Sequence, residues 1–202
     1  LGKRVEILLS KVTTEANFDI AVDSGSVVHF DNCVNKTKLT INAKDLSVVR
    51  FSACDLTNGI YDPTANRIIF PGDVSFDDCA LRMGDTDLSD DHAILHIQWR
   101  GSPTFPTGQR VSVRNCRLYS NANVSGDRYG IVSAADYRAN GNVLVVEGCQ
   151  FYGNFTEAVK VLQGGNLRLD NVDVDGADIA LTLGGSSGLG YEARIGRLNH
   201  RE

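Results

Sequence analysis

The chain has 202 residues and a formal net charge of −5, from 20 lysine and arginine residues against 25 aspartate and glutamate residues. This acidic balance argues against a nucleic-acid-binding protein, which usually carries a basic stripe. No apolar run approaches the ~18 residues that a membrane-spanning helix needs. Short bursts of valine, isoleucine and leucine alternate with glycine, asparagine, aspartate and serine, a pattern typical of strands and turns. We therefore expect an all-β protein that neither binds nucleic acid nor spans a membrane.

The first expected element covers residues 5–12. Val5, Leu8, Leu9 and Val12 have the spacing of an amphipathic helix, which would cap the structure that follows. The same segment also fits a strand repeat, in which Ile7, Leu9 and Val12 point inward. The match to the repeat favours strands, and the helix remains the alternative.

The repeat itself is defined by the five cysteines. Each follows one pattern: apolar, any residue, apolar, two mostly polar residues, Cys, any residue, apolar. The segments are VHFDNCVN, VRFSACDL, VSFDDCAL, VSVRNCRL and LVVEGCQF, and LRLDNVDV continues them with Val172 in the cysteine position. Only Asn35 interrupts the apolar residues that follow these anchor positions. Alternation with a period of two on both sides of the anchor places one set of side chains on a core face.

A sharp bend is expected just before each anchor. The residues there are Asn32, Ala53, Asp78, Asn115, Gly148 and Asn171. Apart from Ala53, these types readily accept the left-handed conformation. A further strand recurs after each bend, with its inward residues at Leu39/Ile41, Ile68/Phe70, Leu95/Ile97, Ile131/Ser133, Val159/Val161 and Leu181/Leu183.

Successive anchors from Cys33 to Val172 lie 21, 25, 37, 33 and 23 residues apart. A variable period over a constant strand core is typical of a solenoid with loop insertions. Weaker matches at both ends predict about eight coils of three short strands, forming a single domain over residues 1–202. Because open solenoid ends expose unpaired backbone, we expect this domain to belong to a longer chain or an assembly.

Stacked coils lie ~4.8 Å apart, so the five cysteines should form one interior column. Parallel side chains at that separation are too far apart for a disulfide, whose Cβ atoms usually lie ~3.5–4.5 Å apart. We expect buried free thiols that act as small hydrophobic residues, and synthesis in a reducing cytosol. The column consists of Cys33, Cys54, Cys79, Cys116 and Cys149.

With these bends and three short strands per coil, the chain resembles the right-handed, pectate-lyase-like β-helix superfamily. The resemblance covers nearly the whole chain, but it rests on the repeat and not on a catalytic motif. It implies a right-handed coil and, by analogy, a function in which the protein contacts carbohydrate. That superfamily includes polysaccharide lyases, hydrolases and epimerases, and also phage tailspikes.

In the enzymes of that superfamily the substrate groove runs along the outside of the last strand of each coil. The corresponding outward row here is expected to read Thr40, Ile69, His96, Val132, Lys160 and Thr182. This row lacks both the carboxylate cluster with a basic residue expected of a lyase and the carboxylate pair of a hydrolase. Catalysis is therefore the less favoured reading, with Asp91, His96 and Lys160 as the catalytic candidates.

Residues 82–92 form the densest charge cluster. Asp85, Asp87 and Asp90 are candidates for a calcium site, although the fixed glycine and terminal glutamate of an EF-hand loop are missing. A solvated acidic loop is the favoured alternative. No nucleotide or flavin fingerprint is present, so we expect no organic cofactor.

Aromatic and arginine side chains near the strand ends of the longer middle coils could stack on sugar rings and bind their hydroxyls. Trp99 is in phase with Leu95 and Ile97, so we expect it to pack inside. The carbohydrate-binding candidates are Arg100, Tyr119, Arg128, Tyr129, Tyr137 and Tyr152.

These features favour a structural, receptor-binding segment of a phage tailspike, tail fibre or similar virion appendage that binds a cell-surface polysaccharide. The alternatives are a polysaccharide lyase, hydrolase or epimerase, and an extracellular filament protein whose solenoids stack end to end. We expect a homo-oligomer, either a trimer or an end-to-end stack, located on the exterior of a virion or cell.

Overall fold

The computed structural model describes residues 5–16, 18–36, 39–43, 46–58, 67–69, 73–83, 92–99, 109–120, 126–135, 142–162, 166–184 and 192–201. All regular elements in these ranges are β-strands, so the segment at residues 5–12 contains a strand over Glu6–Ser10 and no helix. None of the described residues belongs to a helix that could cross a membrane. The expectation of an all-β chain is confirmed for this part of the molecule.

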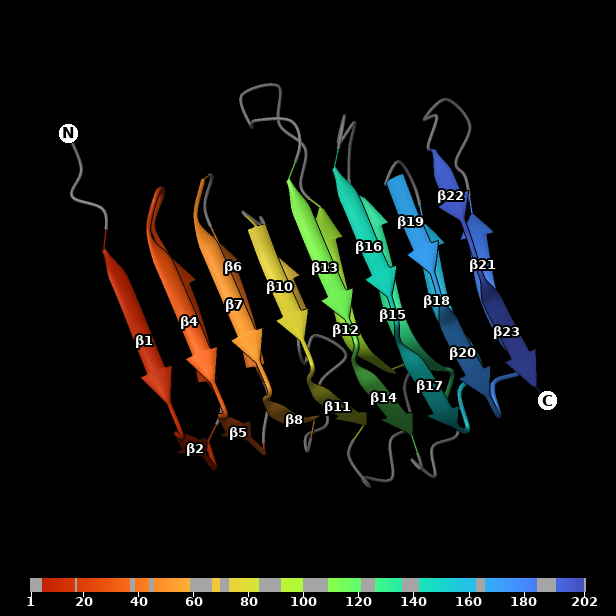
Figure 1. The fold of residues 1–202 in the computed structure, drawn as a ribbon, viewed down its shortest axis with the longest axis horizontal. Coiled ribbons are helices and arrows are strands. Elements are labelled where there is room, and N and C mark those ends of the chain that lie inside the picture. The colour runs from red at the N-terminus through yellow and green to blue at the C-terminus, as the bar shows by residue number, and fades with distance from the viewer. Residues whose placement is uncertain are drawn as a thin grey trace.

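The strands form three parallel sheets that run along the whole length of the molecule (Figure 1). The first sheet contains β1 (Glu6–Ser10), β4 (Val27–Asp31), β7 (Val48–Ser52), β10 (Asp73–Asp77), β13 (Arg110–Arg114), β16 (Val143–Glu147), β19 (Asn166–Asp170) and β22 (Ala193–Ile195). The second contains β2 (Thr13–Thr14), β5 (Val34–Asn35), β8 (Asp55–Asn58), β11 (Ala80–Met83), β14 (Arg117–Ser120), β17 (Gln150–Gly153), β20 (Val172–Asp175) and β23 (Leu198–Arg201). The third contains β3 (Phe18–Val22), β6 (Leu39–Ala43), β9 (Arg67–Ile69), β12 (His92–Trp99), β15 (Arg128–Ala135), β18 (Glu157–Leu162) and β21 (Ile179–Gly184).

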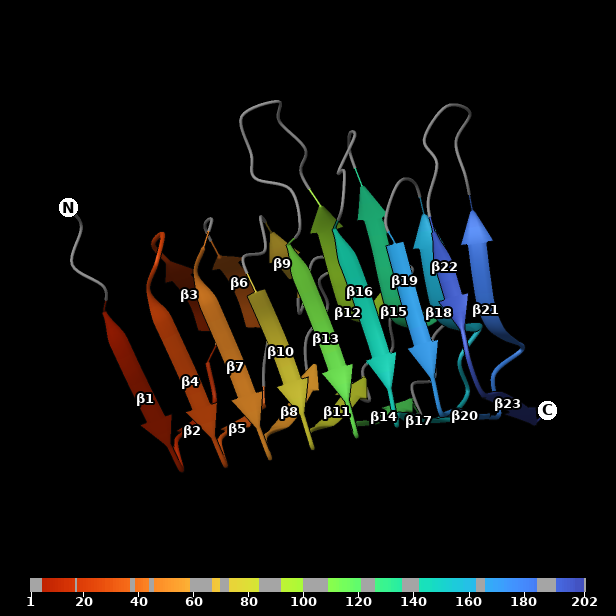
Figure 2. The same ribbon diagram turned by 45° about the horizontal axis from the view of Figure 1, so that its top comes forward.

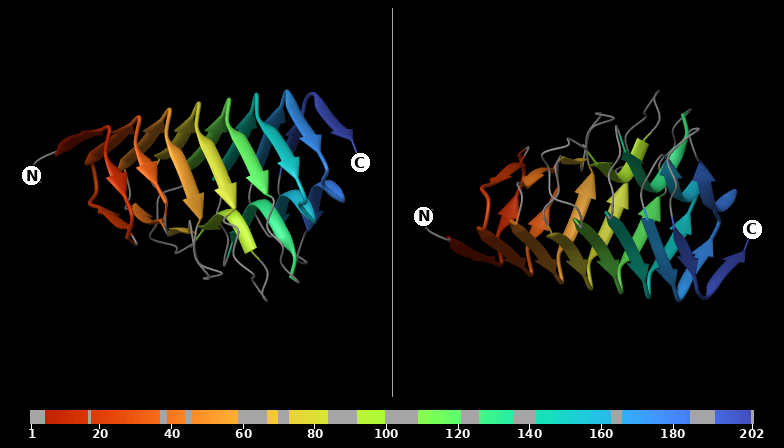
Figure 3. Two further views of the ribbon diagram at one scale, coloured as in Figure 1. Left: turned by 90° about the horizontal axis from the view of Figure 1, so that it is seen from below. Right: turned by 90° about the horizontal axis from the view of Figure 1, so that it is seen from above.

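Each strand pairs with the strand three places further along the chain, so each of the first seven coils contributes one strand to each sheet, and the last described coil contributes β22 and β23 to the first two. Figure 2 shows the third sheet behind the first, and Figure 3 shows the coils succeeding one another from the N-terminus to the C-terminus. This architecture is a parallel solenoid. It results from the repeat, because each coil alone cannot bury its apolar face and needs its neighbours above and below.

The bends between the first and second sheets lie where the repeat predicts them. The residue before each anchor has a φ between 50° and 63° in seven successive coils: Lys11, Asn32, Ala53, Asp78, Asn115, Gly148 and Asn171. Ala53 adopts this conformation despite its Cβ atom, which disfavours left-handed backbone by about 1–2 kcal/mol. The coil geometry therefore overrides the local preference of this residue.

Inward side chains form continuous rows through the core. The rings of Phe30, Phe51 and Phe76 stack nearly parallel, with centroids 4.8 Å and 5.0 Å apart. All five cysteines are buried and free, as the column predicted. Each cysteine Sγ donates a weak hydrogen bond to a backbone carbonyl of the preceding coil, such as that from Cys116 to the carbonyl of Phe76 at 3.4 Å. Asn35, the exception in its row, is buried and accepts a hydrogen bond from Thr14.

The third sheet departs from the expected register in one coil. Ile68, and not Phe70, pairs with Ile41 and Ile97. Consequently Arg67, rather than Ile69, is the register partner of Thr40 and His96. A slip of two residues leaves the same side chains on the same face of the sheet, so hydrophobic alternation cannot detect it.

The longer third-sheet strands also contain a bend that strict alternation does not predict. Two consecutive residues, Ile94 and Leu95, both lie in the core, and so do Ala158 and Val159. Gly130 occupies the equivalent place in β15, where an added Cβ would lie 2.6 Å from a ring carbon of Phe151. Residues that precede the bend therefore face the side of the sheet opposite to the one that strict alternation predicts.

Candidate functional site

Two tyrosines, one exposed and one half-buried, lie side by side on the outer face of the second sheet. Tyr119 of β14 and Tyr152 of β17 are register partners, and their ring centroids are 4.8 Å apart with a tilt of 33°. Tyr152 is 40% exposed. We call these residues the tyrosine pair. Both were carbohydrate-binding candidates, and the parallel register brings them together.

Charged side chains flank the tyrosine pair along the same outward row. Arg82 precedes Tyr119 and Asp175 follows Tyr152 in the register. Arg82 is held by an ion pair with Asp55, at 3.2 Å between Nη2 and Oδ2. Hydrogen-bonding groups beside an aromatic surface are the arrangement that a sugar ring requires, because its faces are apolar and its edges carry hydroxyls.

A second cluster lies on the third sheet and contains Asp127, Tyr129, Glu157 and Lys160; we call it the Lys160 cluster. Lys160 Nζ donates hydrogen bonds to Glu157 Oε1 at 2.7 Å and to the Tyr129 hydroxyl at 3.2 Å, and it lies 4.4 Å from the centroid of the Tyr129 ring. The Tyr129 hydroxyl donates to Asp127 Oδ2 at 2.9 Å. The bend in β15 and β18 brings Tyr129 and Glu157 to the same surface as Lys160.

The Lys160 cluster is mostly buried, with side-chain exposures of 20% for Lys160 and 10% for Glu157. Burial acts to lower the pKa of Lys160, but hydrogen bonding to Glu157 and Tyr129 outweighs it and raises the pKa of Lys160. Burial also raises the pKa of the Tyr129 hydroxyl, against the opposing effect of Lys160. At neutral pH both groups therefore carry their protons. This argues against either as a general base, because a base must be deprotonated to accept a proton.

The other described candidates are separate from one another. Arg128 donates through Nε to the backbone carbonyl of Asn154. This hydrogen bond holds its side chain at the corner between the second and third sheets. His96 is half-buried in the third-sheet row between Arg67 and Val132. The structure thus gathers Tyr129 and Lys160, pairs Tyr119 with Tyr152, and leaves His96 in neither group.

Several candidates fall outside the described residues: Asp85, Asp87, Asp90, Asp91, Arg100 and Tyr137. The backbone of Trp99 belongs to β12, but its side chain is likewise outside the description. Within the described ranges, no group of three or more His, Cys, Asp or Glu side chains could hold a metal ion.

A polar hollow on the outer face of the first sheet was not anticipated. It has a volume of about 460 Å³ and extends over β4, β7, β10 and β13. A signal for it is present in the repeat, since the middle residue of each inward–outward–inward triplet faces outward. Read in this way, the triplets VRF, VSF and VSV put two serines beside an arginine. The hollow lies on the first sheet, away from every described residue that the sequence marks as a candidate.

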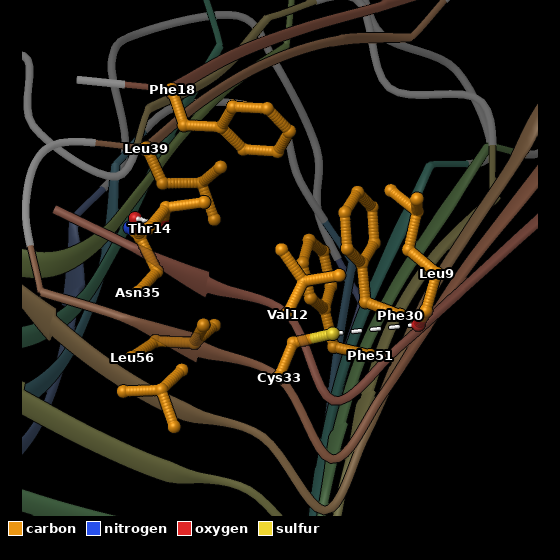
Figure 4. Close-up of a pocket in the computed structure, with 11 residues that line it drawn as sticks. Leu9, Val12, Thr14, Phe18, Phe30, Cys33, Asn35, Leu39, Phe51 and Leu56 are labelled. Carbon is orange, nitrogen blue, oxygen red and sulfur yellow. Dashed lines mark hydrogen bonds between the residues drawn. The ribbon is translucent and has the colours of Figure 1, made fainter. Parts of the chain in front are cut away.

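An apolar cavity of about 270 Å³ lies inside the first coils (Figure 4). Phe18, Phe30 and Leu39 point into it, and the Thr14–Asn35 contact lies at its edge. Several exposed apolar residues of the same coil, including Ile7 and Leu8, lie nearby in the sequence. The cavity is a continuation of the solenoid core, not a separate site.

Comparisons with protein-family models, with curated proteins and with solved structures find no significant match for this chain.

Proposed function

We propose that the protein is a structural and receptor-binding segment of a phage tailspike, tail fibre or similar virion appendage, and that it binds a cell-surface polysaccharide through the tyrosine pair. The observation that carries this proposal is the side-by-side arrangement of Tyr119 and Tyr152 on an exposed sheet face, with Arg82 and Asp175 beside them. Aromatic side chains contribute a large apolar surface at low entropic cost and have a polar tip.

The proposal includes a right-handed coil of the pectate-lyase-like type. Its support is the strong general preference for right-handed crossovers between parallel strands. The course of the chain through the three sheets in Figures 1 and 3 agrees with this handedness.

A location on the exterior of a virion, after folding in a cytosol, is supported by the five free and buried thiols. Ordinary secreted proteins tend to oxidise cysteines into disulfides, whereas cytosolic folding keeps them reduced.

A homo-oligomer, as a trimer or an end-to-end stack, is part of the same proposal. Light scattering of the purified protein and of the native particle would measure its stoichiometry.

Binding without catalysis is favoured by the state of the Lys160 cluster. A lyase or epimerase needs a base that removes a proton from the substrate, whereas Lys160 is protonated and paired with Glu157. Depolymerisation of a glycan by the wild-type protein, lost in a Lys160→Met or His96→Ala variant, would replace this proposal with the enzymatic alternative.

The test is binding of the wild-type protein to an array of bacterial surface glycans, followed by titration calorimetry with the oligosaccharides that bind. Tyr119→Ala and Tyr152→Ala should each weaken binding by about tenfold or more, since tenfold corresponds to about 1.4 kcal/mol. Tyr119→Phe is the matched control, because it keeps the ring. Unchanged affinity in both alanine variants would exclude the tyrosine pair as the binding surface.

A further inference from the structure

The first-sheet hollow is shaped by two small side chains in one outward row. Ser75 of β10 and Ser112 of β13 are register partners and form its floor. Arg50 of β7 stands next to Ser75 on one side, and Val145 of β16 stands next to Ser112 on the other. Because two adjacent strands carry only a hydroxymethyl group here, the longer neighbours leave a depression between them.

Charged side chains form the walls of the hollow in opposite-sign pairs. Asp73 and Arg110 are register partners at one edge, and Asp77 and Arg114 are partners at the other. Arg114 Nε also donates to Glu147 Oε2 at 3.2 Å. In the described part of the chain, neither Arg50 nor Arg110 forms an ion pair. Two guanidinium groups therefore retain their donors at the rim.

The balance of charge determines which ligand the hollow suits. Three arginines and two carboxylates, those of Asp73 and Asp77, line the hollow. The third arginine, Arg114, is neutralised by its ion pair with Glu147, which lies outside the lining. A charged ligand of either sign would meet a like charge about as close as an opposite one, so it would gain little net Coulomb energy. An uncharged hydroxyl can donate to a carboxylate and accept from a guanidinium at the same time. The hollow is thus rich in complementary hydrogen-bonding groups without favouring an ion.

We propose that the first-sheet hollow is a second saccharide-binding site, which takes an uncharged, hydroxylated sugar unit. Its volume of about 460 Å³ lies in the range of about 300–1,000 Å³ found for small-molecule sites. That the ligand is a saccharide rests on the proposed function. The inference adds that the sugar units are uncharged and that two faces of the solenoid bind them. Two sites on one rigid chain increase avidity for a repeating polymer, provided that the polymer can reach both.

The experiment isolates the hollow in a background without the tyrosine pair. The double variant Tyr119→Ala/Tyr152→Ala is titrated with uncharged hexose and deoxyhexose oligosaccharides, and with hexuronate oligosaccharides of equal length. It should retain binding to at least one uncharged oligosaccharide. Adding Ser75→Phe, which fills the hollow, should weaken this residual binding by about tenfold or more.

Two further variants control for misfolding and for general surface effects. Arg168→Phe places the same bulky group in the same outward row beyond Val145, and it should leave binding unchanged. Arg50→Met removes one rim donor without filling the floor, and it should also weaken binding. Circular dichroism and the thermal midpoint show whether each variant is folded.

The outcomes separate this inference from the proposed function. If neither Ser75→Phe nor Arg50→Met affects the residual binding, or if the double tyrosine variant binds nothing, the hollow is not a saccharide site. The proposed role of the tyrosine pair then stands. Loss of binding by Ser75→Phe alone, without an effect of the tyrosine substitutions, supports the hollow and overturns the role of the pair. Tighter binding of hexuronates contradicts the charge argument, and a wild-type protein that binds none of the oligosaccharides overturns both proposals.

Discussion

The inner and outer faces of the same strands follow different rules. Along the core, one chemistry repeats from coil to coil, as in the cysteine column and in the stack of Phe30, Phe51 and Phe76. On the outside of the first sheet the chemistry changes at almost every coil. Its middle row runs through His29, Arg50, Ser75, Ser112, Val145 and Arg168. Interior side chains must fit the coils above and below, whereas exterior ones can vary at little cost in stability.

The Lys160 cluster is intermediate between the two faces. It lies on the outer surface of the third sheet, yet its side chains are mostly buried and hydrogen-bond to one another. The tyrosine pair is also on an outer surface, but Tyr152 is exposed and Tyr119 only half-buried. Residue type alone therefore does not indicate which tyrosine is available to a ligand; the partners of each hydroxyl and ring do.

The largest effect is expected from a charge placed on the inner face. Cys116→Asp should lower the free energy of unfolding by more than about 4 kcal/mol, because it places a carboxylate in a fully buried row. Urea denaturation measures the change. The matched control is Arg117→Asp, which puts the same carboxylate on the exposed neighbouring residue and should have little effect. Normal stability of Cys116→Asp would contradict the inward assignment of the cysteine column.

A smaller loss is expected in the intermediate cluster. Lys160→Met removes the partner of Glu157 and leaves a mostly buried carboxylate unpaired. We expect a loss of about 2–3 kcal/mol, below the ~3–5 kcal/mol found when one partner of a fully buried pair is removed. Lys36→Met breaks an exposed ion pair with Glu15 and should have little effect on stability, because water screens the pair. Equal effects of the two substitutions would show that the Lys160 cluster behaves as an ordinary surface.

The pH dependence of unfolding tests the same cluster in the wild-type protein. The pKa of Lys160 is raised above its usual 10.5, and that of Tyr129 above its usual 10.0. Because the folded state binds these protons more tightly than the unfolded state, their contribution is fully present below the unfolded pKa and is lost as the pH rises through the folded pKa. Urea midpoints should therefore fall above about pH 10, and less steeply in Lys160→Met. An identical alkaline profile in that variant would contradict this assignment.

The smallest effect concerns the bends between the two faces. Ala53→Gly should stabilise the protein by about 0.5–1 kcal/mol, since glycine adopts a φ of 51° without a Cβ penalty. The greater flexibility of glycine in the unfolded chain offsets part of the gain. Asn32→Ala, at the same position one coil earlier, should destabilise the protein. A thermal midpoint that rises for Ala53→Gly and falls for Asn32→Ala would confirm that the bend is the cause, and a fall for both would contradict it.

The sequence was sufficient for the strand order, the bends and the core because these depend on local alternation. Val28, Phe30 and Cys33 can be assigned to the core from the spacing of their own coil alone. The register of β9 could not be obtained in this way, since a slip of two residues keeps every side chain on the same face. The outward position of Tyr129 and Glu157 was also hidden, because it depends on a bend in β15 and β18 that places two consecutive residues in the core, which strict alternation does not predict.

The sequence by itself therefore determined what repeats: the period, the inward rows, the left-handed bends and the free thiol column. Each of these follows from short-range alternation and from residue types that tolerate the bend. Only the tertiary structure decided which outward residues meet, because that depends on the pairing of strands separated by a whole coil. The tyrosine pair, the Lys160 cluster and the first-sheet hollow all arise from such pairings, between residues 28 to 37 positions apart in the chain.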